Sequence, residues 1–439
     1  MNLTLLASCW QSLFTTRADE LAKVAHFIQR QNKLTGSGFL SALACVWSKH
    51  PGASYEALAV PLGISRQALF DRFTPQATAL CRSVLFEALQ HSFAADPQAL
   101  PLLDQFHGTF LDDCSQLPLP DACAEEFAGC GSGVCELGKA GMKVFTRFEI
   151  QGGSIQHLSI HPARFADAKA LAQAPELPKG ALHLADLGFA DFAQIQSQTD
   201  KGVYRITRLP VQTSVRLPEG AKNRPLTDLL KEWREQGETQ VDLPDVQVGN
   251  KEKAKGRLAV LACPADVVEK RLRKANENAK RRGRQVSARQ QEMCHWQVLF
   301  SNVPVAWLST TQLWQVYRLR WQVELLFKRF KSHGGMQQSS SEKPERVKCE
   351  WYVKLLIQVV KNALMLLRGG PLAGVNQVLL GQVVQDWTTK MFEALGQGVA
   401  ALRRVLRQLH EYLKRLRPRT KRRKNPTATQ WFADASPPG

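Results

Sequence analysis

The sequence predicts an α/β protein, and three patterns along its 439 residues support that prediction. Apolar residues recur at helical spacing through roughly the first hundred residues. Short strand patterns then alternate with helical ones, an order typical of an α/β core. Helical periodicity returns near Ser309 and continues to about Leu416. We therefore expect a core of strands and helices between two helical regions.

A helix-turn-helix pattern occurs within the helical N-terminal region. Ser54 and Ser65 are residue types that cap helices, and Gly63 suits the turn between them. The second helix would present Arg66 and Gln67 to the major groove of DNA. An ordinary helical hairpin that does not bind DNA fits the same residues equally well.

The expected core consists of short strands separated by turns and helices. An apolar strand at 181–189 is interrupted by one aspartate, Asp186, which is costly to bury unless its charge is paired or bound to a cation. The other core strands are expected in 106–119, 143–150, 154–160 and 202–215, and helices in 162–174 and 189–198.

Residues 210–293 differ from their surroundings because they are polar and rich in Lys and Arg, which indicates an insertion. It contains a strand pattern at 256–264 and a basic helix around Glu269–Arg289. The core resumes with a strand at His295–Phe300 and a long helix for which Ser309 is a plausible N-cap. The expected divisions are 1–104, 105–209, 210–293, 294–370, 371–417 and a disordered basic tail at 418–439.

The charge of the chain favours a polyanionic partner. It has 58 Lys and Arg against 39 Asp and Glu, a net charge of +19. Residues 269–289 hold nine basic and two acidic residues, and residues 403–424 hold eleven and one. The sequence has no run of about 18 apolar residues, so we expect no membrane segment and a nucleic-acid partner in the cytoplasm.

The ten cysteines indicate reduced thiols rather than disulfides or a metal site. None belongs to a C-x-x-C pair. Cys123, Cys130 and Cys135 form the only cluster, and their spacing does not match a zinc site.

Four reactive side chains would share one face if residues 317–331 formed a continuous helix. Tyr317, Arg320, Glu324 and Lys331 then fall within an arc of about 60°, with Lys328 beside them. The opposite side holds apolar residues, namely Leu319, Val323, Leu326 and Phe330. A solvated face stabilised by charge pairs is the ordinary alternative.

The spacing Tyr-x2-Arg-x3-Glu-x6-Lys resembles the signature of the insertion-sequence-four family of DDE transposases. The flanking Trp321 and Phe327 agree with it. The resemblance implies an RNase H-like catalytic core with a mixed sheet and a β-rich insertion before the glutamate helix. It also implies two catalytic aspartates on strands upstream of Glu324.

The resemblance also indicates which aspartates these are. Asp186 stands in the Asp-x-Gly-aromatic context typical of the second one. For the first, Asp113 followed by Ser115 and a Leu-Pro pair matches the family pattern, although threonine is more usual than Ser115. Neighbours on a strand face opposite ways, so only one of Asp112 and Asp113 can join the site, and the Asp112 register stays open.

The implied chemistry depends on two divalent cations. Asp113, Asp186 and Glu324 would supply oxygen ligands suited to Mg²⁺ or Mn²⁺, with Asp113 bridging the two ions. Such a pair can activate the attacking oxygen and stabilise the leaving 3′ oxygen at phosphorus.

The resemblance assigns DNA contacts to the surrounding residues. The expected phosphate contacts are Tyr317, Arg320, Lys328 and Lys331, with Arg208 carried over from its spacing after Asp186. Trp296 precedes Glu324 by the interval at which some relatives have a tryptophan that stacks on a flipped base. Packing of Trp296 in the core is the alternative, and Trp307 or Trp314 could serve instead.

The expected function is therefore cut-and-paste transposition. The chain would bind the terminal inverted repeats of its own element as a synaptic homodimer, cleave through hairpin ends and join them to target DNA, in the bacterial cytoplasm at the nucleoid. Two alternatives remain, a DNA-binding regulator that does not cut and a two-metal nuclease without strand transfer.

Overall fold

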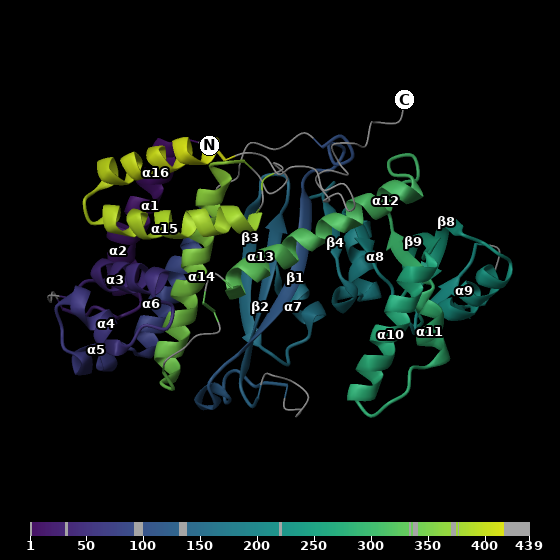
Figure 1. Ribbon diagram of the computed structural model, residues 1–439, viewed down its shortest axis with the longest axis horizontal. Helices are drawn as coiled ribbons and strands as arrows, with labels where there is room; N and C mark the ends of the chain where they lie inside the picture. The colour runs from purple at the N-terminus through teal and green to yellow at the C-terminus, as the bar shows by residue number, and fades with distance from the viewer. Residues whose placement is uncertain are drawn as a thin grey trace. The chain divides into compact units, whose positions relative to one another are not determined.

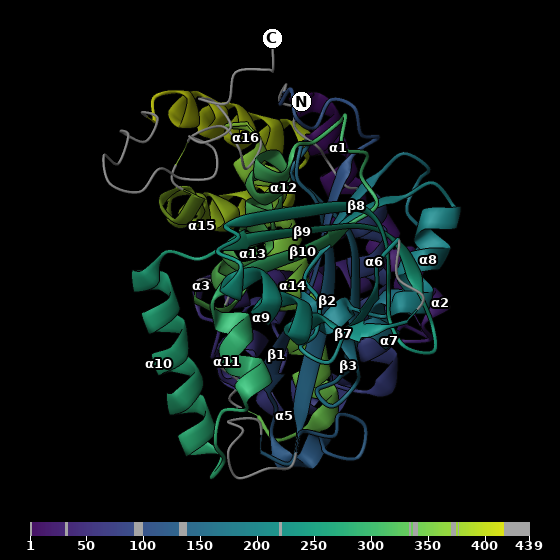
Figure 2. The ribbon, with the colours of Figure 1, turned by 90° about the vertical axis from the view of Figure 1, so that its right-hand side faces the viewer.

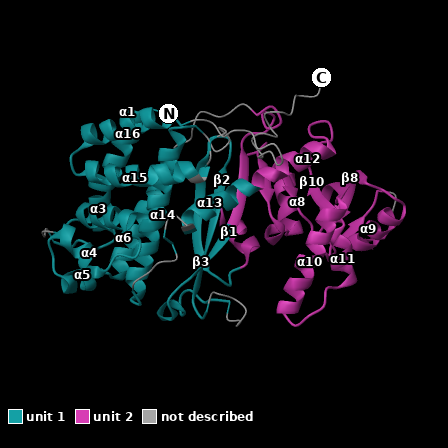
Figure 3. Cartoon of the chain, in the orientation of Figure 1, with its two compact units in different colours: residues 1–99, 114–165, 321–430 teal, residues 100–113, 166–320, 431–439 magenta. Residues whose placement is uncertain are grey.

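The structure is a computed structural model that describes residues 2–30, 34–91, 100–130, 138–218, 222–332, 335–336, 341–369, 375 and 377–416. Within them the chain forms two compact units (Figure 3). The first unit holds residues 1–99, 114–165 and 321–430, and the second holds residues 100–113 and 166–320. The tail expected at 418–439 and Cys135 lie outside the described residues.

Helices form the N-terminal part of the first unit. They are α1 (Leu3–Ser12), α2 (Ala18–Val24), α3 (Gly36–Lys49), α4 (Tyr55–Ala59), α5 (Arg66–Arg72) and α6 (Pro75–Gln90). The side chains of Ser54 and Ser65 cap α4 and α5 as the sequence predicts, and Gly63 between them is left-handed, with φ of 62°. A Cβ on Gly36 would lie 2.3 Å from Cβ of Ala22, so glycine is required where α3 packs on α2.

Four more helices complete the first unit (Figure 1): α13 (Trp321–Ser332), α14 (Pro344–Leu366), α15 (Gln377–Leu395) and α16 (Val399–Lys414). α14 is buried along nearly its whole length and packs against α3, α6 and α15. Lys354 within it donates to Glu350 at 2.6 Å, so these two buried charges are paired. The rings of Phe14 and Phe392 lie 5.3 Å apart, which joins α15 to the N-terminal helices.

The strands form a mixed sheet in the order β3-β2-β1-β4-β5-β10-β9-β8-β6-β7. They are β1 (Thr109–Pro118), β2 (Gly141–Glu149), β3 (Ser154–Pro162), β4 (Leu182–Ala185), β5 (Tyr204–Thr207), β6 (Ser214–Arg216), β7 (Arg224–Pro225), β8 (Gln240–Val248), β9 (Ala254–Ala262) and β10 (Trp296–Ser301). β1, β4 and β5 are parallel, while β2 and β3 pair antiparallel, as do β5 and β10. This is the mixed sheet that the resemblance implies.

The helices of the second unit are α7 (Asp167–Gln173), α8 (Phe192–Asp200), α9 (Leu226–Glu235), α10 (Ala265–Arg281), α11 (Ala288–Cys294) and α12 (Thr310–Tyr317). Within the expected insertion, β8 and β9 form a long antiparallel pair that continues onto β10. Leu229 and Leu230 of α9 pack with Val260 and Phe300 in one hydrophobic cluster. α10, in contrast, has no buried residue and runs beside α11 (Figure 2).

The long helix expected from Ser309 is interrupted, and this corrects the prediction of one continuous stripe. Ser309 does cap it, in a capping box with Gln312. However, α12 ends at Tyr317, a tighter 3₁₀ turn covers Arg318–Arg320, and α13 then begins at Trp321. A 3₁₀ turn advances about 120° per residue instead of about 100°, so Tyr317 and Glu324 do not lie on one straight helix.

No helix in the described ranges has the length and apolar character required to span a membrane.

Candidate active site

Asp112 and Asp113 are neighbours on β1 and experience different environments, as strand alternation requires. The Asp112 side chain is completely buried, with Oδ2 3.1 Å from Nε2 of His183 on β4. Arg205 on β5 pairs with His183 in the strand register and is buried as well. Burial lowers the pKa of Arg205 to about 10, and the charge of Asp112 acts in the opposite direction. Asp112 therefore belongs to a buried polar network that is closed to solvent.

Asp113 lies in the middle of β1, and Asp186 directly follows β4, the strand that runs parallel to it. The register pairs Asp112 with Ala185, so Asp113 and Asp186, one residue further along, lie side by side where β4 ends. A single guanidinium nitrogen of Arg320, Nη1, lies 3.7 Å from Oδ2 of Asp113 and 3.9 Å from Oδ2 of Asp186. The two carboxylate side chains are 20% and 37% exposed. They form an accessible acidic pair that shares one positive charge.

Tyr317 ends α12 beside this pair and is buried. Its hydroxyl donates to the carbonyl oxygen of Ala185 at 3.4 Å. The guanidinium of Arg208, which follows β5, lies 5.7 Å from the centre of the Tyr317 ring. Burial first, and then the charge of Asp186, raise the pKa of Tyr317 to about 12. The phenol therefore stays protonated and acts as a hydrogen-bond donor at neutral pH.

The remaining residues of the motif lie on α13, in the first unit. The apolar residues expected on its buried side, Val323, Leu326 and Phe330, are buried. Glu324 and Lys331 are partly exposed, and Lys328 is exposed. α13 therefore has the apolar and polar sides that the sequence predicts for residues 321–331.

Trp296 is packed in the hydrophobic cluster around β9 and β10. Only 3% of it is exposed, and its indole N–H donates to Glu292 at 3.2 Å. A base cannot stack on an indole buried in this way, so the structure favours the core-packing alternative. Trp321, which sequence reasoning used only as a motif flank, is 57% exposed at the start of α13. The one local sequence feature that could have indicated a role for Trp321 is its position directly after Arg320.

Arg66 and Gln67 begin α5, the second helix of the helix-turn-helix pattern. Both side chains are exposed, and Nε2 of Gln67 donates to Asp71 one turn later at 3.0 Å. α5 spans only Arg66–Arg72, which is two turns of helix. The local geometry is that of a helix-turn-helix with an exposed second helix.

The donor set at the strand ends suits a hard divalent cation. Carboxylate oxygens are the ligands that Mg²⁺ and Mn²⁺ prefer. Asp113 and Asp186 already converge on one cationic group, the Arg320 guanidinium, so the position favours positive charge. Across the described residues, no group of three or more His, Cys, Asp or Glu side chains is gathered as a metal site.

The fold and these carboxylates define the class of protein. Parallel β1, β4 and β5, with antiparallel β2 and β3 beside β1, form an RNase H-like core. Asp113 lies within the first of these parallel strands, and Asp186 follows the end of the second. Enzymes of this class act on nucleic acids.

The family follows from comparison with known proteins. The chain belongs to the family described as "Transposase DDE domain", whose model matches residues 108–360. It is thus an enzyme that acts on DNA.

Several curated transposases are similar over most of their length. The transposase for insertion sequence element IS231F of Bacillus thuringiensis subsp. israelensis is 26% identical over 77% of this chain and 75% of its own. The transposase for IS1151 of Clostridium perfringens is 22% identical over 95% of this chain and 93% of its own. A shorter match, 34% identical over 99 residues, joins 23% of this chain to 26% of the putative transposase InsL of Escherichia coli.

Proposed function

We propose that this transposase binds the terminal inverted repeats of an insertion sequence, cleaves the DNA at them and joins the freed ends to target DNA. The observation that carries the proposal is the convergence of Asp113 and Asp186 on Arg320 at the edge of an RNase H-like sheet. Asp113 and Asp186, together with Glu324, are the proposed catalytic carboxylates. Asp113 is preferred to Asp112 because Asp112 is enclosed against His183.

The carboxylates would hold two Mg²⁺ ions, or Mn²⁺, which when bound activate the attacking oxygen and neutralise charge at the phosphorus. The protein's own cations have a different task. Arg320 is placed to exchange its contact with the aspartates for a bidentate contact with a DNA phosphate. The other proposed phosphate contacts are Lys328, Lys331 and Arg208, with Tyr317 donating through its hydroxyl.

An exposed aromatic side chain suits an unpaired base better than a buried one. We therefore assign base stacking to Trp321 in place of Trp296. Stacking quenches indole fluorescence, so end DNA should quench the wild type and the Trp296→Phe variant but not the Trp321→Phe variant. Quenching that disappears only with Trp296→Phe would return the role to Trp296.

The remaining parts of the proposal concern assembly. A synaptic homodimer acting at the bacterial nucleoid, in the cytoplasm, suits a DNA-cutting enzyme with a net charge of +19. Hairpin ends are the proposed route to second-strand cleavage. Arg66 and Gln67 on α5 are proposed to contact DNA because both side chains are exposed.

The test is cleavage of end-bearing DNA by the purified chain with Mg²⁺, followed on a denaturing gel. Wild type should cut, and Glu324→Gln and Asp186→Asn should bind the DNA without cutting it. Asp200→Asn removes one exposed carboxylate at the end of α8 and is the matched control, which should cut normally. Equal cutting by wild type and Glu324→Gln would contradict the assignment, and binding without cutting by the wild type would favour a regulator.

Strand transfer separates a transposase from a two-metal nuclease. Precut ends carrying a 3′-OH should be joined to a target plasmid by the wild type. Cutting without any joining would favour the nuclease.

A further inference from the structure

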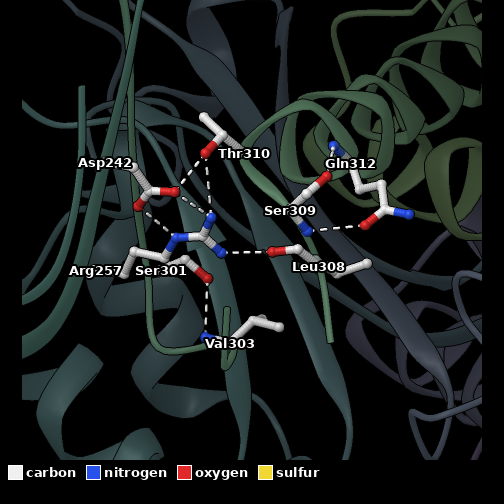
Figure 4. Close-up of polar contacts among 8 residues, drawn as sticks. All are labelled: Asp242, Arg257, Ser301, Val303, Leu308, Ser309, Thr310 and Gln312. Carbon is white, nitrogen blue, oxygen red and sulfur yellow. Dashed lines mark hydrogen bonds and ion pairs between the residues drawn. The ribbon is translucent and has the colours of Figure 1, made fainter. Parts of the chain in front are cut away.

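A buried polar cluster fastens the start of α12 to the strands of the insertion (Figure 4). Arg257 on β9 is only 2% exposed and lies at its centre. Its Nε donates to Oδ1 of Asp242 on β8 at 2.7 Å, and its Nη2 donates to Oδ2 of the same carboxylate at 2.5 Å. Such a two-point contact fixes the guanidinium plane.

The other donors of the same guanidinium reach α12. Nη1 donates to the carbonyl oxygen of Leu308 at 2.5 Å, and Nη2 also contacts Oγ1 of Thr310 at 3.3 Å. The hydroxyl of Thr310 in turn donates to Asp242, which closes the cluster. Ser309 between them is the N-cap of α12. The first residue of the helix and the residue before its cap are therefore both bound by one side chain.

The charge of Asp242 belongs to this arrangement. Burial alone would raise the pKa of its carboxyl group, but the hydrogen bonds from Arg257 and Thr310 outweigh burial and lower it. The Asp242 carboxyl group is consequently ionised at neutral pH, and it faces the Arg257 guanidinium. Removal of Asp242 would leave the buried charge of Arg257 without compensation, whereas Asp242 itself is partly exposed.

The far end of α12 carries the residues of the proposed DNA site. Tyr317 is its last residue and binds the carbonyl oxygen of Ala185, next to Asp186. Arg320 follows in the 3₁₀ turn and contacts the aspartates. A helix of eight residues is only about 12 Å long, so a shift or tilt at its start is transmitted to its end.

We propose that Arg257, together with Asp242 and Thr310, is a positioning group that sets Tyr317 and Arg320 against the aspartate edge through α12. The cluster touches neither Asp113 nor Asp186, so its effect on the reaction is indirect. It makes the insertion part of the catalytic geometry, because β8 and β9 supply two of its three side chains. The inference rests on the proposed DNA cleavage.

The test separates DNA binding from the rate of cutting. We would measure the dissociation constant for end DNA without Mg²⁺, and the single-turnover cleavage rate at saturating DNA with Mg²⁺. Arg257→Met and Thr310→Val should keep the dissociation constant within about two-fold and cut at least about ten-fold more slowly, because misplacement of about 1 Å at a reacting centre has effects of this size. Thr310→Ser keeps the hydroxyl and should restore the rate to within about two-fold.

A matched control distinguishes positioning from general destabilisation. Arg234 on α9 makes a two-point contact with Glu292 on α11, also within the insertion but not with α12. Arg234→Met should lower the melting temperature and leave the cleavage rate of bound DNA unchanged below it. If Arg257→Met does not fold, comparison of the cleavage rates of Thr310→Val and Thr310→Ser tests the inference instead.

Two results would overturn the inference. One is that Arg257→Met or Thr310→Val cuts bound DNA as fast as the wild type. The other is that Arg234→Met slows cutting as much as they do. Failure of the wild type itself to cut would instead refute the proposed function, so the two failures are distinguishable.

Discussion

Adjacent residues on β1 lie in different surroundings, and we propose different roles for them on that ground. Asp112 pairs with His183 in the interior, and Asp113 reaches the exposed edge beside Asp186. A carboxylate paired in the interior contributes to stability, and one at an accessible edge can serve as a ligand.

Substitution of each aspartate by asparagine should separate these tasks. Asp113→Asn should abolish DNA cleavage with little change in melting temperature, since its side chain is partly exposed. Asp112→Asn should destabilise the fold by about 3 kcal/mol, because the buried Nε2 of His183 loses its carboxylate partner. Chemical denaturation and the cleavage gel measure the two effects. A catalytically dead but fully stable Asp112→Asn variant would show that the two roles are reversed.

Lys361 on α14 gives the fold a pH dependence of its own. Burial lowers the pKa of Lys361 to about 8 from an ordinary value of 10.5. Below pH 8 the folded protein must hold a buried ammonium, which is destabilising, whereas above 10.5 the group is neutral in both states. Stability should therefore rise with pH between these values.

Lys361→Met removes that dependence. The variant should be more stable than the wild type by about 3 kcal/mol at neutral pH, and the difference should disappear as the pH approaches 10.5. Melting temperatures at pH 7 and pH 10 test this. A difference that is the same at both values would mean that the lysine is not the titrating group.

At the scale of single residues, local sequence predicts some sites and not others. Asp186 could be found because an aspartate inside an apolar strand is a conflict visible within a few residues. Arg257 gave no such signal, because its partners Asp242 and Leu308 are 15 and 51 residues away. Only the folded sheet brings them together.

At the scale of elements, the segment that holds the proposed catalytic motif shows where periodicity fails. Residues 310–332 have helical spacing throughout, yet the helix is broken at Arg318–Arg320. Tyr317 is held by Ala185 and Arg320 by two aspartates, and these are tertiary contacts. The helical periodicity on either side is correct, and the interruption depends on contacts that periodicity does not contain.

α10 is the element expected to follow the DNA backbone, because it is basic and none of its residues is buried. Arg273 and Lys280 are both exposed, and they lie on the same face of the helix about two turns apart. Replacing both by Gln should reduce the slope of log binding constant against log salt by about 1.8, or about 0.9 for each lost phosphate contact.

The charge-matched control replaces Lys23 and Lys231 by Gln. These two lysines are exposed on α2 and α9. The control variant should leave the salt slope unchanged. Equal slopes for both variants would mean that α10 makes no specific contact with the DNA backbone.

At the scale of the whole molecule, we propose that the outer side of α16 takes part in pairing two copies or in contacting DNA. Its inner side is buried in the first unit, through Leu402, Leu406, Leu409 and Leu413. Truncation of the chain before α15 would also remove Phe392, which packs on Phe14. Such a variant would expose the core of the first unit, so it would test folding and not assembly.

Charge reversal on the outer side is therefore the better experiment. Arg403 and Arg407 are exposed one turn apart. Arg403→Glu with Arg407→Glu should leave the melting temperature unchanged and abolish complexes that contain two DNA ends in a gel shift. Two-ended complexes at wild-type yield would exclude this side of α16 from synapsis.

The overall organisation could be predicted in part. Alternating strand and helix patterns indicated the α/β core, and the charge indicated a DNA partner. The membership of the two units could not be predicted, because the first unit combines 1–99, 114–165 and 321–430. Linear changes in composition carry no information about such a combination.

The discontinuity of the first unit has a consequence during synthesis. Its N-terminal helices leave the ribosome first, but α14, against which α3 and α6 pack, ends only at Leu366. Until then the faces of α3 and α6 that contact α14 have no native partner on the nascent chain. The described part of the second unit is complete at Arg320 and can fold earlier. A message cut short before α14 would therefore yield a polypeptide with a folded second unit and an unfinished first one, a natural target for chaperones and proteases.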